Sequence, residues 1–331
     1  MRALLRGGTH MLALLKLLQD GRFHSGEALG AALGVSRSAV WKQLQALQAE
    51  LLLPLHKVRG RGYRLATPLQ LLDADWLNAQ VDAPQWCACV MSSVDSTNAE
   101  ALRLLPAAQS LPYYVLAERQ TSGRGRRGRS WVSPFGENLY YSLVVRVEGG
   151  MRQLEGMSLA VGLALLQVIR SFGVAEAGLK WPNDVLVGER KLAGILLELS
   201  GDPADVCHVV IGIGLNVNML VAESGAIGQP WTSMRAELGR LLNRNELVAE
   251  LNRQLSRYLD IQLREGFAAL QDEWQACHLW HGRAVALTAG GEPVEGEVLG
   301  VDHSGAIRLR INGLERSFSG GELSLRLRDD S

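Results

Sequence analysis

The feature that most constrains this chain is a glycine- and arginine-rich segment enclosed by two apolar segments. Residues 121–131 read TSGRGRRGRSW; YYVLAERQ precedes them and ENLYYSLVVRV follows a few residues later. Val, Leu and Tyr in such runs favour strands, so the basic segment is predicted to be a loop between two strands. A disordered nucleic-acid arm is disfavoured, because such an arm is longer and lies at a terminus.

The glycine spacing in GRGRRG also matches the dinucleotide fingerprint G-x-G-x-x-G. That fingerprint requires a helix directly after it, whose N-terminus holds the pyrophosphate. Here Pro134 and Gly136 follow, and then the second strand, and no G-K-[ST] sequence completes a phosphate-binding P-loop. We therefore expect a mobile loop whose glycines let the backbone approach a phosphate-bearing ligand and whose arginines supply paired donors to it.

The length of the chain and the uneven distribution of its charge indicate more than one domain. With 331 residues, 47% apolar and 21% charged, it has the composition of a soluble globular protein with two or three domains. The net charge is zero, but residues 1–66 hold ten Lys or Arg against three acidic residues, or +7. A small basic module on a mildly acidic body predicts an anionic partner for the module.

The basic module has the pattern of a winged helix-turn-helix. Helical periodicity is expected at 11–21, 25–35 and 36–52, with Ser25 and Ser36 as N-caps and Gly34 in the turn. LHKVRGRGYRLA then predicts a basic hairpin, the wing. A three-helix bundle with a solvated basic face is the alternative. The residues expected to contact DNA lie at the start of the third helix and in the wing: Ser36, Arg37, Ser38, Trp41, Lys42, Arg59 and Arg61.

Residues 1–10 fit no expected element, and either Met1 or Met11 could be the translation start. The four cysteines lack the spacing of a zinc site, and we expect free thiols in the cytoplasm. No apolar run approaches the length of a membrane span, so no membrane partner is expected.

The remainder predicts an α+β fold, with a mixed-sheet domain and a small C-terminal domain. Thr97 and Glu100 have the spacing of a capping box at the start of a helix. Residues 178–199 are expected to form strand, Gly-Glu turn and strand. The last fifty residues alternate apolar and polar between glycine turns, which predicts an SH3-like β-barrel. The expected domains are 1–66, 67–280 and 281–331.

Five motifs together carry a resemblance to a known family. DSTN, GRGRRGRSW, KWPNDV, KLAGILLE and GIGLNVN occur in the order and spacing of biotin protein ligases, and the resemblance extends over essentially the whole chain. It is similar to the bifunctional class, whose winged helix represses the biotin operon. The resemblance implies that biotin and ATP, with Mg²⁺, form biotinyl-AMP, and that biotin passes to a lysine of the carrier domain of acetyl-CoA carboxylase. It also implies operator DNA as a partner and a homodimer promoted by the ligand.

The resemblance also implies roles for individual residues. Lys191, Arg126 and Arg124 would be catalytic. Biotin would be bound by Ser96, Thr97, Asn98, Gln120, Gly123, Arg124, Gly125, Arg126, Lys191 and Gly194. ATP would be bound by Arg129, Asn183, Asp184, Asn216 and Trp231. No dedicated metal site is expected; Mg²⁺ would arrive with ATP, and Asp184 could help to hold it.

Several alternatives stay open at this point. Lipoate ligases share the adenylation chemistry, although they usually lack the GRGRRGRSW pattern. A ligand-sensing repressor with an inactive ligase core is a second alternative, and a vestigial DNA-binding module is a third. Trp231 could be an ordinary core aromatic residue, and Lys191 a turn residue in solvent.

Overall fold

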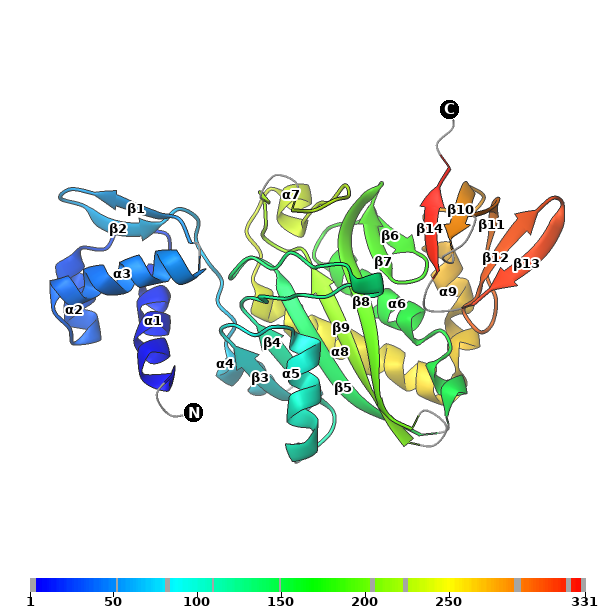
Figure 1. The fold of residues 1–331 in the computed structure, drawn as a ribbon, viewed down its shortest axis with the longest axis horizontal. Helices are drawn as coiled ribbons and strands as arrows, with labels where there is room; N and C mark the ends of the chain where they lie inside the picture. Colours follow the sequence, from blue (N-terminus) through cyan, green and yellow to red (C-terminus); the bar gives the residue numbers. More distant parts are fainter. Residues whose placement is uncertain are drawn as a thin grey trace. The chain divides into compact units, whose positions relative to one another are not determined.

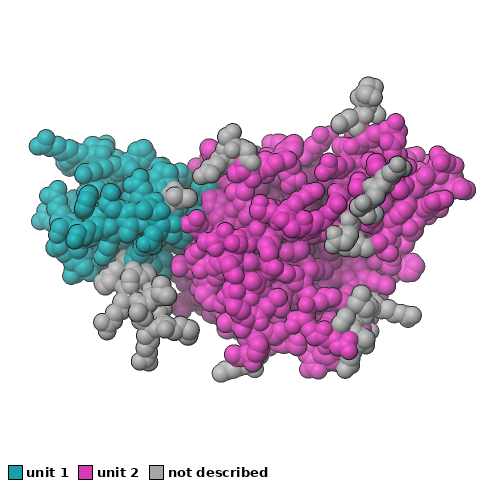
Figure 2. Space-filling view, in the orientation of Figure 1, with its two compact units in different colours: residues 1–71, 135–137 teal, residues 72–134, 138–331 magenta. Residues whose placement is uncertain are grey.

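The structure is a computed structural model that describes residues 4–51, 53–80, 84–108, 110–148, 150–202, 206–222, 226–288, 293–319 and 323–328. The chain divides into two compact units, which Figure 2 shows in different colours. The first comprises residues 1–71 with residues 135–137, and the second comprises 72–134 and 138–331. Within the described ranges, none of the helices is both long and apolar enough to cross a membrane.

Three helices and a hairpin form the N-terminal unit (Figure 1): α1 (Leu4–Leu18), α2 (Gly26–Leu33), α3 (Arg37–Leu51), β1 (Leu55–Val58) and β2 (Gly62–Leu65). The predicted caps are confirmed, since the hydroxyls of Ser25 and Ser36 accept the N–H groups of Ala28 and Ala39. Gly34 ends α2 in the left-handed conformation. The expectation that residues 1–10 fit no element is wrong, because α1 begins at Leu4.

A glycine lets the hairpin lie close against the segment between α1 and α2. Gly62 has a φ of +102°, and a side chain there would collide with the backbone of His24. His24 and Tyr63 form a β-bridge, which adds a third short strand segment to the hairpin. The core contains Leu14, Leu18, Val40, Leu44 and Leu47, with Phe135 from the returning segment among them.

The larger unit is built on a seven-stranded sheet in the order β3-β4-β5-β9-β8-β7-β6. Its strands are β3 (Cys87–Met91), β4 (Tyr113–Ala117), β5 (Leu139–Glu148), β6 (Ala177–Lys180), β7 (Asp184–Val187), β8 (Arg190–Gly201) and β9 (Val206–Leu215). β3 and β4 are parallel and the other neighbours antiparallel, so the expected mixed sheet is confirmed. The helices are α4 (Ala74–Asn78), α5 (Thr97–Leu104), α6 (Met157–Ser171), α7 (Met234–Leu238), α8 (Arg244–Glu265) and α9 (Gln271–Ala276).

The two faces of this sheet bury different partners. Along β4, Tyr114 and Leu116 belong to the main core with α6 and α8. Tyr113 and Val115, which alternate with them, pack with Ala101 of α5. Helices therefore cover both faces, and the α5 face is the one on which the pocket described below opens.

A second sheet follows, in the order β13-β12-β11-β10-β14. It consists of β10 (Ala284–Thr288), β11 (Val294–Val301), β12 (Ile307–Ile311), β13 (Leu314–Phe318) and β14 (Ser324–Leu327), all antiparallel. β13 and β14 are its two edges and do not pair with each other in the described ranges. An antiparallel β-sheet is thus confirmed, whereas a closed SH3-like barrel is not.

Two local predictions for the larger unit need correction. Ser96, not Thr97, stands at the N-cap position of α5, and it makes no capping hydrogen bond. The Thr97 hydroxyl donates instead to Gln120, a partner distant in sequence. Residues 178–199 form three strands rather than two, because Trp181-Pro182-Asn183 interrupts the first one and leaves β6 and β7 as a hairpin.

Two charged side chains of this unit are buried against each other: Arg244, which is 0% exposed, forms an ion pair with Glu118, which is 3% exposed. Arg244 also donates to the carbonyl oxygen of Asn138 at 3.0 Å. The other Glu118 oxygen accepts the N–H of Leu72 at 2.6 Å. Two charges removed from water at this depth require such a full set of partners.

We predict that Arg244→Met destabilises the larger unit by about 3–5 kcal/mol, because it leaves the Glu118 carboxylate buried without its counter-ion. Chemical denaturation followed by tryptophan fluorescence measures the loss. The double variant Glu118→Gln/Arg244→Met should recover part of it, because no charge is then buried and the Leu72 N–H keeps an acceptor. A single variant as stable as the unsubstituted protein would contradict this account of the pair.

Candidate functional site

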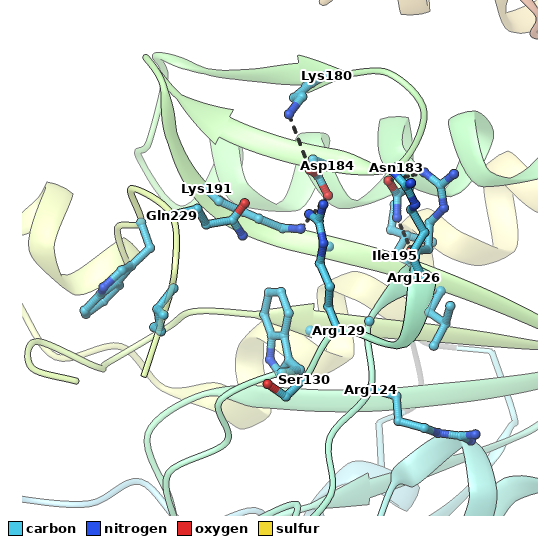
Figure 3. A pocket seen from close by; sticks show the side chains of 18 of the residues that line it. Arg124, Arg126, Arg129, Ser130, Lys180, Asn183, Asp184, Lys191, Ile195 and Gln229 are labelled. Carbon is cyan, nitrogen blue, oxygen red and sulfur yellow. Dashed lines mark hydrogen bonds and ion pairs between the residues drawn. The ribbon is translucent and has the colours of Figure 1, made fainter. Parts of the chain in front are cut away.

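A pocket of about 930 Å³ opens in the larger unit. Its walls come from the start of α5, the arginine-rich loop, β6 to β9, the segment 226–231 and strand β14. Figure 3 shows the side chains at its basic end. All the residues assigned to biotin or ATP from the sequence line this pocket, apart from Gly123, which lies beside it.

Glycines form the floor of the pocket. The sheet register aligns Gly212 with Ser142 and Leu196, and Gly214 with Tyr140 and Gly194. A methyl group on Gly212 would collide with the amide of Asn98, and one on Gly214 would lie 2.5 Å from the Trp131 ring. One on Gly194 would lie 3.2 Å from the Lys191 ammonium. Asn98 and Trp131 can therefore lie flat against the sheet only because Gly212 and Gly214 lack a Cβ, and Gly194 lets the Lys191 side chain pass closely.

A chain of hydrogen bonds crosses the inner end of the pocket. The Gln120 carbonyl accepts from the N–H of Thr97 at 2.8 Å and from its hydroxyl at 3.1 Å. The Ser142 hydroxyl, which has a single proton, lies within hydrogen-bond distance of two acceptors, the Thr97 hydroxyl at 2.8 Å and the Asn98 carbonyl at 2.6 Å. Gln120 donates onward to Ser133. Ser96, Thr97 and Asn98 are all at most 5% exposed, so this end offers a polar, uncharged surface with fixed orientations.

The arginine-rich loop is folded as a tight hairpin. Trp131 N–H donates to Gly123 and Gly125 N–H to Arg129, with Arg124 and Ser130 forming a bridge between them. A Cβ on Gly123 would meet the Trp131 carbonyl at 2.6 Å, which explains this glycine. Gly125 has ordinary space around it. The hairpin brings the backbone of both arms to the rim of the pocket.

Two arginines of this loop have different surroundings. Arg126 donates to the side chain of Asn183 and to the carbonyl oxygen of Leu323, both at 3.0 Å. Asn183 in turn donates to the carbonyl oxygen of Ile195 (Figure 3). Arg124 instead points away from Lys191 and Asp184 and forms an ion pair with Glu198 at 3.2 Å. The structure thus brings Arg126, but not Arg124, to the basic end.

Positive charge gathers around one carboxylate. Lys191 lies 2.7 Å from Asp184, and Lys180 lies 4.0 Å from it (Figure 3). Burial lowers the pKa of Lys180; Asp184 opposes this shift, whereas Lys191, Arg129 and Arg326 add to it. Two lysines beside one carboxylate, with Arg129 and Arg326 near enough to act on Lys180, leave an excess of positive charge, which an anionic ligand would neutralise.

Lys191 is fixed by its backbone to the segment that carries Trp231. Lys191 N–H donates to Pro230, and Thr232 N–H donates back to Lys191, each at 3.0 Å. Asn216 is 4% exposed and donates to the carbonyl oxygen of Thr232. Asn216, Trp231 and Lys191 therefore share one wall of the pocket, and Lys191 is not a turn residue in solvent.

Sequence reasoning missed several pocket residues: Trp131, Lys180, Gly212, Gly214, Trp280 and Arg326. The Trp131 ring lies 5.5 Å from the Lys191 ammonium, and the Trp280 ring lies 4.5 Å from that of Lys180. Trp131, Lys180 and both glycines lie inside the motifs GRGRRGRSW, KWPNDV and GIGLNVN, but the motifs alone indicate no role for them.

The candidate DNA-binding residues all belong to the N-terminal unit. Ser36, Arg37, Ser38, Trp41 and Lys42 are exposed at the start of α3, and Arg59 and Arg61 are exposed in the hairpin turn. The Arg61 guanidinium lies 4.4 Å from the centre of the Phe23 ring, which restricts its side chain.

Comparison with known proteins agrees with this arrangement. Residues 10–64 match an HTH domain, residues 90–216 the biotin/lipoate A/B protein ligase family, and residues 281–326 the biotin protein ligase C-terminal domain. The bifunctional ligase/repressor BirA of Salmonella typhimurium is 41% identical over 315 residues, 95% of this chain and 97% of that protein. The protein of the same name from Escherichia coli is 39% identical over 97% of this chain and 99% of its own length.

Among solved structures, the biotin protein ligase from Aquifex aeolicus in complex with biotin and ATP aligns with a TM-score of 0.64 and 28% identity. The alignment covers 73% of this chain and 99% of the Aquifex aeolicus chain. Fold, pocket and matched regions define a ligase core that carries a helix-turn-helix module. The chain belongs to the biotin protein ligase family, in its bifunctional ligase/repressor class.

We predict that Gly214→Ala displaces the Trp131 ring, because the added methyl group would lie 2.5 Å from it. Tryptophan fluorescence should shift, and biotin affinity, measured by calorimetry, should fall by at least about tenfold, as expected for a site that loses its packing surface. Gly228→Ala is the matched control, since nothing lies within 4 Å of its added methyl group. Equal biotin affinities in the two variants would contradict the proposed role of the glycine floor.

Proposed function

We propose that this protein joins biotin to a lysine of the carrier domain of acetyl-CoA carboxylase, using ATP, and represses biotin synthesis genes by binding operator DNA. The observation that carries the ligase activity is the two-part pocket. A polar, uncharged inner end adjoins a group of four cations, and biotin itself has a neutral ureido ring and a carboxylate tail. The relatives named bifunctional ligase/repressor support both activities.

The inner end would receive the ureido ring. Ser96, Thr97, Asn98 and Gln120 would hydrogen-bond to it, and the glycine floor at Gly194 leaves room for the ring and tail. The backbone of Gly123 to Arg126 would lie over the carboxylate, with Lys191 reaching carboxylate and α-phosphate together. Arg124 would contribute mainly through its backbone, because its side chain is engaged with Glu198.

Attack of the biotin carboxylate on the α-phosphate brings two anions together, so the transition state needs concentrated positive charge. Lys191 and Arg126 are already held in place by Asp184, Asn183 and Leu323 and would not have to reorganise. A donor placed in this way contributes about 3–4 kcal/mol to transition-state stabilisation. Pyrophosphate then leaves, and the amine of the acceptor lysine attacks the carbonyl carbon of biotinyl-AMP and releases AMP.

The ATP side would be formed by Arg129, Asn183, Asp184, Asn216 and Trp231, with Trp231 stacked on adenine. Asn183 would act on the phosphates through Arg126, since both ends of its amide are hydrogen-bonded. No group of three metal-ligating side chains occurs in the described part of the chain. Mg²⁺ would therefore be held mainly by the ATP phosphates, with Asp184 nearby, and when bound it neutralises phosphate charge.

Residues 1–66 would form the DNA-binding domain, and its wing and the start of α3 would contact the operator. Residues 67–280 would form the catalytic domain. Residues 281–331 would form the C-terminal domain, for which we retain an SH3-like arrangement as a proposal. Formation of biotinyl-AMP would promote a homodimer that binds the operator, a ligand-driven shift between association states. The four free cysteines fit a cytoplasmic location.

The experiment that tests the ligase activity is ATP–pyrophosphate exchange by the full-length protein, with biotin and lipoate compared. We expect exchange with biotin. Exchange with lipoate alone would make the protein a lipoate ligase, and exchange with neither would leave a DNA-binding sensor.

We predict that Arg126→Gly slows adenylation and also lets biotinyl-AMP escape, because the loop loses its contacts with Asn183 and Leu323. The expected fall in kcat/KM is about 100-fold or more, the usual effect of removing one transition-state donor. Escape is measured by biotinylation of a bystander protein such as albumin. Arg127→Gly, an exposed neighbour in the same loop, is the control. Retention of biotinyl-AMP by Arg126→Gly would contradict the role of the loop as a cover.

We predict that the double variant Arg59→Ala/Arg61→Ala weakens operator binding and reduces its salt dependence. Each lost phosphate contact should lower the slope of log K against log salt by about 1. Fluorescence anisotropy over a salt series measures both effects, with Arg283→Ala in the larger unit as the control. An unchanged slope of log K against log salt would show that the hairpin does not contact DNA phosphates.

A further inference from the structure

The acidic residue that ends the KLAGILLE motif, to which the resemblance assigned no role, joins two parts of the pocket. Glu198 lies on β8, where the register places it in the row of Val210, Val144 and Tyr113 on the α5 face of the sheet. A single oxygen of its carboxylate accepts from the Asn98 amide at 2.7 Å and from Arg124 at 3.2 Å. The glutamate thus connects the start of α5 with the arginine-rich loop.

Its first effect is on the Asn98 amide. A carboxylate has no proton to donate, so it selects the amino end of that amide and leaves the carbonyl end facing the Ser142 hydroxyl at 2.6 Å. Gly212 beneath Asn98 leaves the amide close against the sheet, and the residue is 3% exposed. The carbonyl oxygen of Leu196 accepts from the same amino group at the longer distance of 3.3 Å. Glu198 is therefore the nearer and the charged one of two acceptors that orient this group at the inner end of the pocket.

Its second effect is on the loop. Arg124 lies in the first arm of the hairpin, directly between Gly123 and Gly125, and its backbone bridges to Ser130 in the second arm. An anchor on the Arg124 side chain consequently fixes both arms against β8. The side chains of Arg124 and Glu198 are 46% and 26% exposed, so the ion pair adds little to global stability. The ion pair instead determines the local position of the arginine-rich loop.

We propose that Glu198 is a positioning residue for the biotin half of the site, which orients the Asn98 amide and holds the arginine-rich loop over the pocket. It touches no reacting atom; it acts through Asn98 and Arg124. This inference rests on the proposed placement of biotin at the inner end of the pocket.

The test compares Glu198→Ala with the full-length protein in ATP–pyrophosphate exchange and in calorimetric titration with biotin. Loss of a hydrogen bond to a charged group predicts a rise of about tenfold in the Kd and KM for biotin. The KM for ATP should stay within about twofold, because the contacts of Lys191 and Arg126 are untouched. Glu198→Gln, which keeps an acceptor but loses the charge, should give an intermediate value.

Glu148→Ala is the matched control, since it removes another Arg–Glu pair of the same sheet, with Arg146 at 2.9 Å, at a distance from the pocket. Arg124→Ala in the Glu198→Ala background separates the effect on the loop from the effect on Asn98. Because Glu198→Ala has already removed the loop contact, Arg124→Ala should raise the Kd for biotin less in this background than in the otherwise unsubstituted protein.

Unchanged biotin affinity in Glu198→Ala overturns the proposal. Equal weakening of biotin and ATP together with a lower Tm also overturns it, because that pattern indicates a general loss of structure. Wild-type protein that neither binds biotin nor exchanges pyrophosphate would refute the biotin ligase activity itself, which distinguishes that failure from a failure of Glu198 alone.

Discussion

The buried ion pair of Arg244 and Glu118 is the interaction on which the larger unit depends. Neither charge reaches water, so each requires a complete set of partners, and those partners are backbone groups far apart in sequence. They are the N–H of Leu72, where the chain enters the unit, and the carbonyl oxygen of Asn138, where it returns after residues 135–137. One pair thereby fixes both entry points of the chain relative to β4 and α8.

The same pair supports the pocket through Asn138. The side-chain oxygen of Asn138 accepts the N–H of Val217, and Val217 follows Asn216 in the pocket wall. At the other end of the arginine-rich loop, the Tyr140 hydroxyl donates to the carbonyl oxygen of Pro134. The loop and the wall are thus attached to a rigid frame within a few residues of the ligand-facing side chains. Such a frame permits preorganised charge, because the charged groups do not have to be ordered when the ligand binds.

Local sequence signals predicted the elements whose stabilising partners are local. Ser25 and Ser36 cap their helices within three residues, and the basic segment is a loop because strands flank it on both sides. The prediction for Thr97 was wrong because its hydroxyl bonds to Gln120, 23 residues away, and no spacing rule reports such a partner. Arg244 and Glu118 are 126 residues apart and were invisible for the same reason. The pocket motifs were found by family resemblance, but the need for glycine at 212 and 214 became evident only once Asn98 and Trp131 were seen against the sheet.

The division of the pocket into an uncharged and a charged end follows from which side chains the sheet can accommodate. At the inner end, Gly212 and Gly214 let Asn98 and Trp131 lie close against the strands, and the two charges nearby, Glu198 and Arg124, are paired with each other. At the outer end, the edge strands β6 and β14 carry Lys180 and Arg326, and Asp184 begins β7, which pairs with β6. Lys191 lies at the boundary: its stem crosses Gly194 and its ammonium meets Asp184. In the proposed placement, a ligand with a neutral ring and an anionic tail would be oriented by this division, with its carboxylate beside Lys191.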